Sequence, residues 1–212
     1  MAKKIKEIHD QINLLTTKGR TGYHTAVEID IAVYMASKWL FDFYYKMFEE
    51  NNAIYDSLRP FATDPTVITL NGSGQYILPA DFIHEIGQIT SGTTNIMVDT
   101  IDRAALSRRI NNNLVPPTVD YPMCAFYATY VQFYPITITN VKFAYLKKPV
   151  QPVYATTISN GREVYDDAAS VDVEWNEVDL AKVTTRAMSV LGINLEDLKL
   201  VQWSENKENK DQ

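Results

Sequence analysis

The stretch from residue 25 to residue 50 reads TAVEIDIAVYMASKWLFDFYYKMFEE, and it contains neither glycine nor proline. Thr25 and Glu28 have the spacing of a capping box, in which each side chain accepts a hydrogen bond from a free amide at the start of a helix. Apolar residues then recur every three or four positions, at Ile29, Val33, Ala36, Leu40, Phe43 and Met47. The pattern predicts a long helix that ends near Glu50.

A second set of large side chains lies on the other flank of this helix: Trp39, Phe41, Tyr44, Tyr45 and Phe48. A helix that is apolar over more than one stripe is expected to be buried on several sides. In a chain of 212 residues, this predicts either a central core helix or a helix that packs against a neighbouring subunit.

Shorter helices are predicted on both sides of the long one. Ile5, Ile8, Ile12 and Leu15 have helical spacing in a segment that Gly19 and Gly22 interrupt. Near the other end, Asn176 or Asp172 is placed to cap a helix over 178–191, and Gly192 is typical of its C-terminal stop. Asn194 is placed to cap a last helix to about Trp203, and an entirely polar tail follows.

The middle of the chain has the composition of strands. Val67 to Leu70, the turn Asn71-Gly-Ser-Gly74 and Tyr76 to Leu78 predict a hairpin, and Ile83 to Thr90 with Asn95 to Val98 predict two further strands. A short helix over 102–110 carries Arg103, Arg108 and Arg109, and β-branched and aromatic residues resume after Met123. We expect a mostly antiparallel β unit.

Together these elements predict an α+β protein, in which N- and C-terminal helices form a helical part and an antiparallel β insertion lies between them. The expected boundaries are 1–60 and 160–203 for the helical part, 61–159 for the β-rich insertion and 204–212 for the polar tail. Such a tail is expected to order on a partner.

The composition excludes several classes of function. The formal net charge is −6 and the isoelectric point is about 5.1, so the overall cationic footprint of a nucleic-acid-binding protein is missing. No run of about 18 apolar residues predicts a membrane span, and no apolar signal-peptide core follows the basic start. We therefore expect a soluble protein made in the cytoplasm.

The residues that catalysis needs are few. His9, His24 and His84 are the only histidines, and Cys124 is the only cysteine. His9 is expected on the polar face of the first helix, and His84 lacks a second histidine at the spacing of a zinc-binding helix. Cys124 lies in an apolar strand, where a small core residue is expected. We predict no catalytic residue and no enzyme activity.

No cofactor or metal site is predicted either. The acidic loop with Asp166, Asp167, Asp172 and Glu174 lacks the ligand order of a calcium-binding hand, so a solvated surface is expected. The turn at 71–74 lacks the lysine of a phosphate-binding loop. The three arginines of the short helix favour salt bridges within or between subunits over phosphate contacts.

Several segments resemble the connector proteins of bacteriophages. Val67-x-Leu followed by Tyr76-Ile-Leu-Pro-Ala-Asp-Phe82 is similar to a segment of the adaptor and tail tubular A proteins of podovirus-type phages. Phe133-Tyr-Pro135, the run from Val141 to Pro149, Pro152, Val173-Glu-Trp175 and Leu191-Gly-Ile-Asn-Leu195 extend the resemblance over residues 25–203. The likeness is strongest to the ring proteins of crAss-like phages.

This resemblance implies a structural virion protein, a head-to-tail connector or adaptor. Its subunits would form a homo-oligomeric ring, commonly of about twelve copies, that binds the portal protein and other tail or ring proteins at the portal vertex. The helical part would build the ring and contact the portal. DNA would pass through without sequence-specific binding, as acidic walls allow. The residues expected at subunit or partner interfaces are Trp39, Tyr44, Tyr45, Arg108, Arg109 and Trp203.

Two other hypotheses remain open from the sequence. The chain is alternatively a tail or baseplate binding module that recognises a surface ligand through exposed tyrosines, of which the sequence supplies 13 in all. It is also, in principle, a hydrolase that uses Cys124 as a nucleophile. The first alternative predicts a monomer or trimer, and the second predicts an activity that is lost when Cys124 is replaced.

Overall fold

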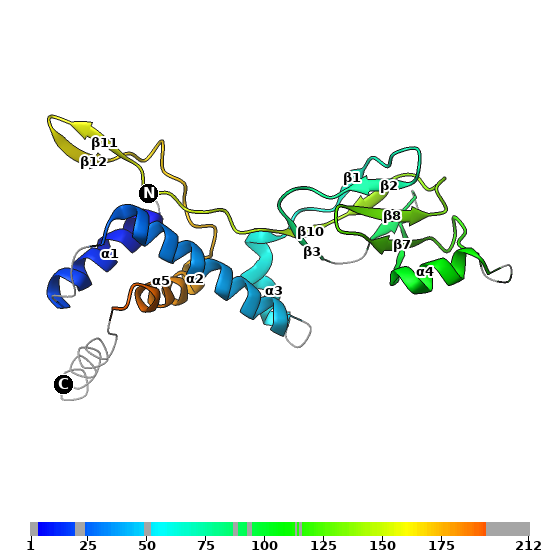
Figure 1. Ribbon diagram of the computed structural model, residues 1–212, viewed down its shortest axis with the longest axis horizontal. Helices are drawn as coiled ribbons and strands as arrows, with labels where there is room; N and C mark the ends of the chain where they lie inside the picture. Colours follow the sequence, from blue (N-terminus) through cyan, green and yellow to red (C-terminus); the bar gives the residue numbers. More distant parts are fainter. Residues whose placement is uncertain are drawn as a thin grey trace. The chain divides into compact units, whose positions relative to one another are not determined.

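The computed structural model describes residues 4–19, 24–48, 52–86, 89–92, 95–112, 114 and 116–193. It divides into two compact units, residues 1–60 with 149–212 and residues 61–148, which we name the helical unit and the β unit (Figure 1). Helices lie toward both ends of the chain and mostly antiparallel strands lie between them, so the predicted α+β class is confirmed.

The helical unit contains α1 (Lys4–Gly19), α2 (Ala26–Met47), α3 (Asn52–Leu58), the start of the 3-10 helix η1 (Arg59–Phe61), β11 (Thr156–Ser159), β12 (Arg162–Tyr165) and α5 (Glu177–Val190). The predicted capping box is present, since Thr25 Oγ1 accepts from the Glu28 amide and Glu28 accepts from the Thr25 amide at 2.8 Å. Asn176 caps α5. Asp172, the other predicted cap, instead accepts from the Ile5 amide at 2.9 Å in the first turn of α1.

The boundary between the units differs from the expected one. The helical unit resumes at Pro149, earlier than the predicted residue 160, and the hairpin β11–β12 belongs to it. Two contacts explain this: the Tyr154 amide donates to Asp30 of α2 at 3.0 Å, and Val153 forms a β-bridge with Val171. These contacts attach the segment that precedes the β11–β12 hairpin to the rest of the helical unit.

Only some of the apolar residues that were predicted to form the buried face of α2 are buried. Ile29, Val33, Ala36 and Leu40 are buried. Phe43 and Met47, predicted on the same face, are 44% and 37% exposed. The first alternative, a central core helix, is therefore wrong, and packing of α2 against a neighbouring subunit stays a prediction. Its main packing partner is α5, whose Val183 and Ala187 are buried.

The β unit contains the end of η1, ten strands and α4 (Arg103–Ile110) among its described residues. One sheet has the order β1 (Thr66–Ile68), β9 (Val141–Phe143), β4 (Thr90–Ser91), β5 (Ile96–Met97). A second has the order β2 (Gln75–Ile77), β8 (Tyr130–Tyr134), β7 (Met123–Phe126), β6 (Asp99–Thr100), and β3 (Phe82–Glu85) pairs with β10 (Tyr145–Lys147). All pairs are antiparallel except β6 with β7.

The predicted hairpin of β1 and β2 is wrong, because the two strands lie in different sheets. The turn between them is present: Asn71 Oδ1 accepts from the amides of Ser73 and Gln75, at 2.9 Å each. Gly74 has φ +74° and would bring a Cβ within 3.0 Å of Phe133 O. Only glycine suits this backbone, and the turn redirects the chain from one sheet to the next.

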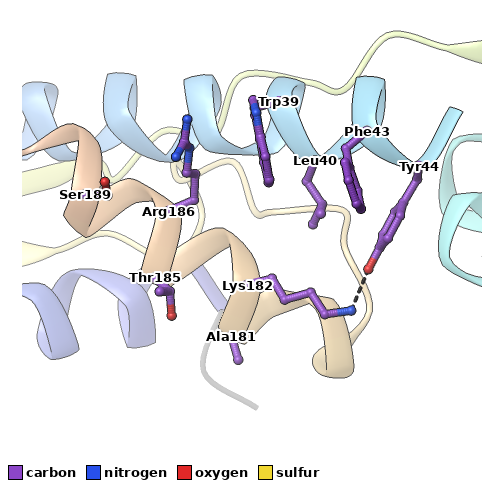
Figure 2. Close-up of a pocket in the computed structure, with 9 residues that line it drawn as sticks. All are labelled: Trp39, Leu40, Phe43, Tyr44, Ala181, Lys182, Thr185, Arg186 and Ser189. Atoms are coloured by element: carbon purple, nitrogen blue, oxygen red, sulfur yellow. Dashed lines mark hydrogen bonds between the residues drawn. The ribbon is translucent and has the colours of Figure 1, made fainter. Parts of the chain in front are cut away.

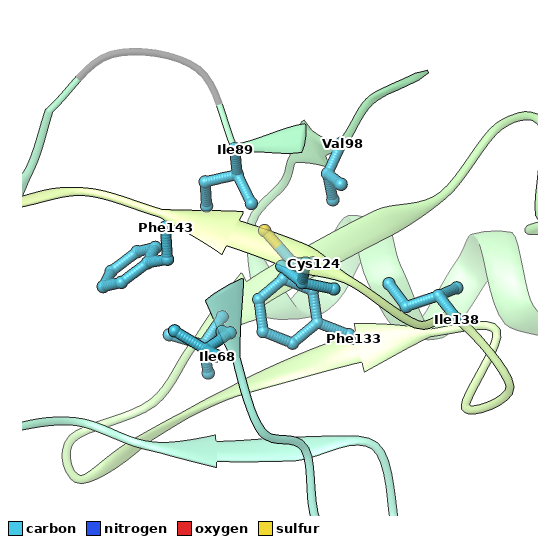
Figure 3. Close-up of a cluster of buried hydrophobic side chains, with 9 residues drawn as sticks. Ile68, Ile89, Val98, Cys124, Phe133, Ile138 and Phe143 are labelled. Atoms are coloured by element: carbon cyan, nitrogen blue, oxygen red, sulfur yellow. The ribbon is translucent and has the colours of Figure 1, made fainter. Parts of the chain in front are cut away.

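The core of the β unit lies between these sheets. Cys124, Phe133 and Val141 are fully buried, and Ile68, Ile89 and Val98 surround them (Figure 3). The core extends to a set of mutually packed rings, Phe82, Phe126, Phe143 and Tyr145. These side chains form the enclosed core of the β unit, while other large apolar residues of the unit, such as Ile77 and Leu114, are exposed.

Candidate interaction surface

A row of six large apolar side chains runs along the exposed side of α2. Its members are spaced four residues apart and are between 37% and 66% exposed: Val27, Ile31, Met35, Trp39, Phe43 and Met47. We name this row the α2 ridge. Residues four apart form a continuous ridge on a helix, and such ridges fit the grooves of another helix.

Side chains of the α2 ridge contact one another, so the ridge is a continuous surface. The rings of Trp39 and Phe43 are stacked, with centroids 5.5 Å apart and an interplanar angle of 11°. A neighbouring row of the helix carries the exposed charges Lys38, Asp42 and Lys46. An apolar row with charges along one side is typical of a protein-protein interface with an apolar centre and a polar rim.

A pocket of about 560 Å³ adjoins the C-terminal half of the α2 ridge, between α2 and α5 (Figure 2). It is lined by Trp39, Leu40, Phe43 and Tyr44 of α2 and by Ala181, Lys182, Thr185, Arg186 and Ser189 of α5. The Arg186 guanidinium lies over the Trp39 ring, 4.6 Å from its centroid. We name this the α2–α5 pocket. Its lining combines aromatic surfaces with two cations.

One end of the α2–α5 pocket is held by a polar network. The Tyr44 hydroxyl donates to Asp179 Oδ1, and Lys182 Nζ donates to Tyr44 Oη at 2.6 Å and to Asp179 Oδ1 at 2.9 Å. The Asp179 amide donates to Asn176 Oδ1 at 2.8 Å, which completes the N-cap of α5. The network therefore fixes the start of α5 against α2.

Burial and hydrogen bonding act in opposite directions on Asp179. Burial of its carboxylate would raise its pKa, but hydrogen bonds from Tyr44 and Lys182 outweigh this and leave the pKa below its ordinary value of 3.8. Burial, and next the bond to Asp179, raise the pKa of Tyr44. The hydrogen bonds with Tyr44 and Asp179 raise the pKa of Lys182. At neutral pH the network is thus an ion pair with a neutral phenol.

His9 does not lie on a polar face, which corrects the sequence prediction. Its side chain is buried, its Nε2 lies 2.8 Å from Asp30 Oδ1, and its ring stacks on Tyr154 with centroids 4.2 Å apart. Asp30 Oδ2 also accepts from the Tyr154 amide. The cluster joins α1, α2 and the segment before β11, so its role is structural. The sequence did contain a signal for this cluster, because the position of Asp30 along the helix places its carboxylate on the buried face of α2.

The predicted interface residues have different positions. Trp39 lies at the centre of the α2 ridge. Tyr44 is buried in the Asp179 network, and Tyr45 is half-buried. Arg108 and Arg109 are exposed in the last turn of α4, in the β unit, and form no salt bridge with any residue that the structure describes. Trp203, the predicted last helix and the polar tail lie outside the described residues.

Sequence reasoning missed the α2–α5 pocket and its cations. Lys182 and Arg186 are four residues apart on a helix that was predicted, so their shared face was readable from the sequence. The partner of that face was not readable, because no local signal says which surface of α2 receives α5.

Cys124 lacks the surroundings of a nucleophile. Burial raises the pKa of its thiol to about 12, and its hydrogen-bonding neighbour is Thr100 Oγ1 at 3.6 Å. A reactive cysteine needs a lowered pKa and access to solvent. Among the described residues, no three His, Cys, Asp or Glu side chains are grouped to hold a metal ion.

The chain matches no protein-family model, and no curated protein matches its sequence. Within the described residues, none of the helices combines the length and the apolar composition that crossing a membrane requires.

Proposed function

We propose that this chain is the structural subunit of a ring-shaped head-to-tail connector in a phage virion, where it joins the portal protein to the tail and forms part of the DNA conduit. The α2 ridge is the observation that carries the proposal. It presents Ile31, Met35 and Trp39 to solvent along one line of the longest helix. Burial of such side chains at about 25 cal/mol per Å² favours a stable contact with another subunit.

A second exposed feature of the helical unit supports a ring rather than a two-fold dimer. The hairpin β11–β12 is exposed along almost its whole length, and Ile158 is 80% exposed. A two-stranded hairpin is marginally stable by itself, so a contact with a neighbouring subunit would stabilise it. Cyclic assemblies need two different faces on each subunit, and the α2 ridge and this hairpin are candidates for them.

The charge of the chain is consistent with a conduit. Each copy carries a formal net charge of −6, so a closed ring is strongly acidic as a whole. Negative walls repel the phosphates of DNA and let the duplex slide without a specific contact. This is also what the resemblance to phage connector proteins implies.

The alternative binding-module function receives less support from the aromatic residues. Phe82, Phe126, Phe143 and Tyr145 pack on one another around the core of the β unit. Tyr121 is 74% exposed, but it does not line the α2–α5 pocket. A ligand-binding surface needs several rings that converge on one concave site.

The test is assembly of the purified full-length chain, alone and with the portal ring of the same virus. Light scattering after size exclusion and electron microscopy of stained particles report mass and symmetry. We expect closed rings, of about twelve copies, either alone or on the portal ring. A chain that stays monomeric and does not bind the portal ring overturns the proposal.

A further inference from the structure

The α2–α5 pocket opens beside the point where the chain leaves α5. Ser189 lines the pocket, and α5 ends one residue later, at Val190. Gly192 has φ +73°, and the Ile193 amide donates to Met188 O at 3.0 Å. This is the hydrogen-bonding pattern of a helix C-terminal glycine motif, which turns the chain away from the helix axis. The described chain ends at Ile193, which is buried and lies only four residues after Ser189 in the sequence.

The next residues have a composition that matches the pocket. The segment 195–203 reads LEDLKLVQW and lies outside the described residues. Leu195, Leu198 and Val201 recur every three residues, and Glu196 and Asp197 supply two carboxylates. An apolar stripe beside two carboxylates complements a pocket that is lined by aromatic rings and by two cations.

The two cations of the pocket differ in whether their N–H groups already form hydrogen bonds. Lys182 is already bound to Asp179 and Tyr44. Arg186 has one face on the Trp39 ring, and its N–H groups form no hydrogen bond with another residue that the structure describes. A guanidinium that stacks on a ring keeps its N–H edge available for a carboxylate. Arg186 is therefore the group that an acidic segment would pair with.

The length of the segment also suits the pocket. Its α5 side extends from Ser189 to Lys182, which is about 10 Å along a helix. Nine residues span about 13 Å if helical. A segment that starts beside Ser189 and returns along α5 would bring Lys199 near Thr185 and would cover the pocket-lining sides of Trp39 and Phe43, while Val27, Ile31 and Met35 of the α2 ridge, which do not line the pocket, would stay open to a neighbouring subunit.

We propose that the α2–α5 pocket binds residues 195–203 of the same chain, with their leucines on the aromatic floor and an acidic side chain on Arg186. The same chain is favoured over a second copy because the short connection after Gly192 gives the segment a high effective concentration at the pocket. The inference rests on the pocket and on the sequence of the segment, and it does not depend on assembly into a ring.

Cross-linking in the full-length chain tests the proposal. Thr185→Cys and Lys199→Cys place two thiols on the two sides of the expected contact, and a short bis-maleimide then joins them. Thr185 is exposed and Cys124 is buried, so the fold is preserved and the native thiol does not interfere. The matched control pairs Lys199→Cys with Thr157→Cys, an exposed position on the hairpin of the same unit.

We expect an intramolecular cross-link at least about fivefold more abundant in the first variant than in the control. Adding Arg186→Glu should reduce it about threefold, the size of an exposed ion pair, and Glu196→Lys with Asp197→Lys should restore it. Equal cross-linking in both variants overturns the proposal. A cross-linked dimer in place of the monomer also overturns it and assigns the pocket to the segment of a neighbouring copy.

Discussion

The helical unit and the β unit differ in how their large apolar side chains are arranged. In the β unit, Phe133, Val131 and Phe143 lie in a core enclosed by short strands from two sheets. In the helical unit, α2 buries one face and leaves the α2 ridge exposed. The β unit also exposes apolar side chains, such as Ile77 and Leu114, but in the helical unit six of them form one continuous row, the α2 ridge, which is available for a partner.

The largest expected effect comes from removing a ring in each unit. Phe133→Ala leaves a cavity in the β-unit core and should lower the free energy of unfolding by about 3–5 kcal/mol. Phe43→Ala removes the same ring from the α2 ridge, where it is 44% exposed, and should cost about 1 kcal/mol or less. Urea denaturation followed by circular dichroism measures both. Similar losses of unfolding free energy in the two variants would contradict this difference between the two units.

The second prediction concerns the network that attaches α5 to α2. Asp179→Asn removes the charge that Tyr44 and Lys182 contact, and it should cost about 2 kcal/mol at neutral pH. Because folding lowers the pKa of Asp179, its ionised form stabilises the protein above the unfolded pKa, and this stabilisation is lost as the pH falls through the folded pKa.

The pH dependence separates this effect from general damage to the helix. The free energy of unfolding should fall below about pH 4 less steeply in Asp179→Asn than in the unchanged protein. Asp42→Asn, at an exposed position of α2, is the control and should leave both the stability and its pH dependence unchanged. An equal acid response in Asp179→Asn and the unchanged protein would contradict this role of Asp179.

The third prediction tests the α2 ridge as an interface. Met35→Lys puts a charge in the middle of the row, and it should weaken self-association at least about tenfold, or about 1.4 kcal/mol, without affecting the fold. Leu14→Lys changes a similarly exposed apolar residue of α1 and should leave association intact. Light scattering across a concentration series measures the shift. If both variants associate as the unchanged chain does, the ridge is not the interface.

The smallest expected effect is at Cys124. Replacement by Ala removes one buried sulfur atom and should cost about 1 kcal/mol. Because burial raises the pKa of the thiol to about 12, the folded chain should not react with a thiol reagent at neutral pH, whereas the urea-unfolded chain should. Rapid labelling of the folded chain would instead favour the hypothesis of a cysteine nucleophile.

The parts of the fold that local sequence determines were predictable. The capping box at Thr25 and the glycine stop at Gly192 lie where the sequence indicates, because each depends on hydrogen bonds within a few residues. The predicted strand from Ile83 to Thr90 is instead two short strands, β3 and β4, and β4 pairs with β5. The pairing of β1 with β9 was not predictable, since it joins segments more than seventy residues apart.

The candidate site was predictable to a smaller extent. Trp39 was expected at an interface, and it lies on the α2 ridge, but the sequence could not separate it from Tyr44 on the same helix. The two differ because α5 covers Tyr44 and supplies Asp179 to its hydroxyl. The sequence did not predict a role for Arg186, because its position over the Trp39 ring depends on how α2 and α5 pack.

The sequence by itself determined the α+β class and the long uninterrupted helix. These follow from periodicity and composition. Only the tertiary structure decided which apolar face of α2 is buried, which residues face solvent, and that His9 pairs with Asp30 inside the fold. The physical reason is that the apolar pattern of a helix records which residues avoid water, but not whether its own chain or another covers them.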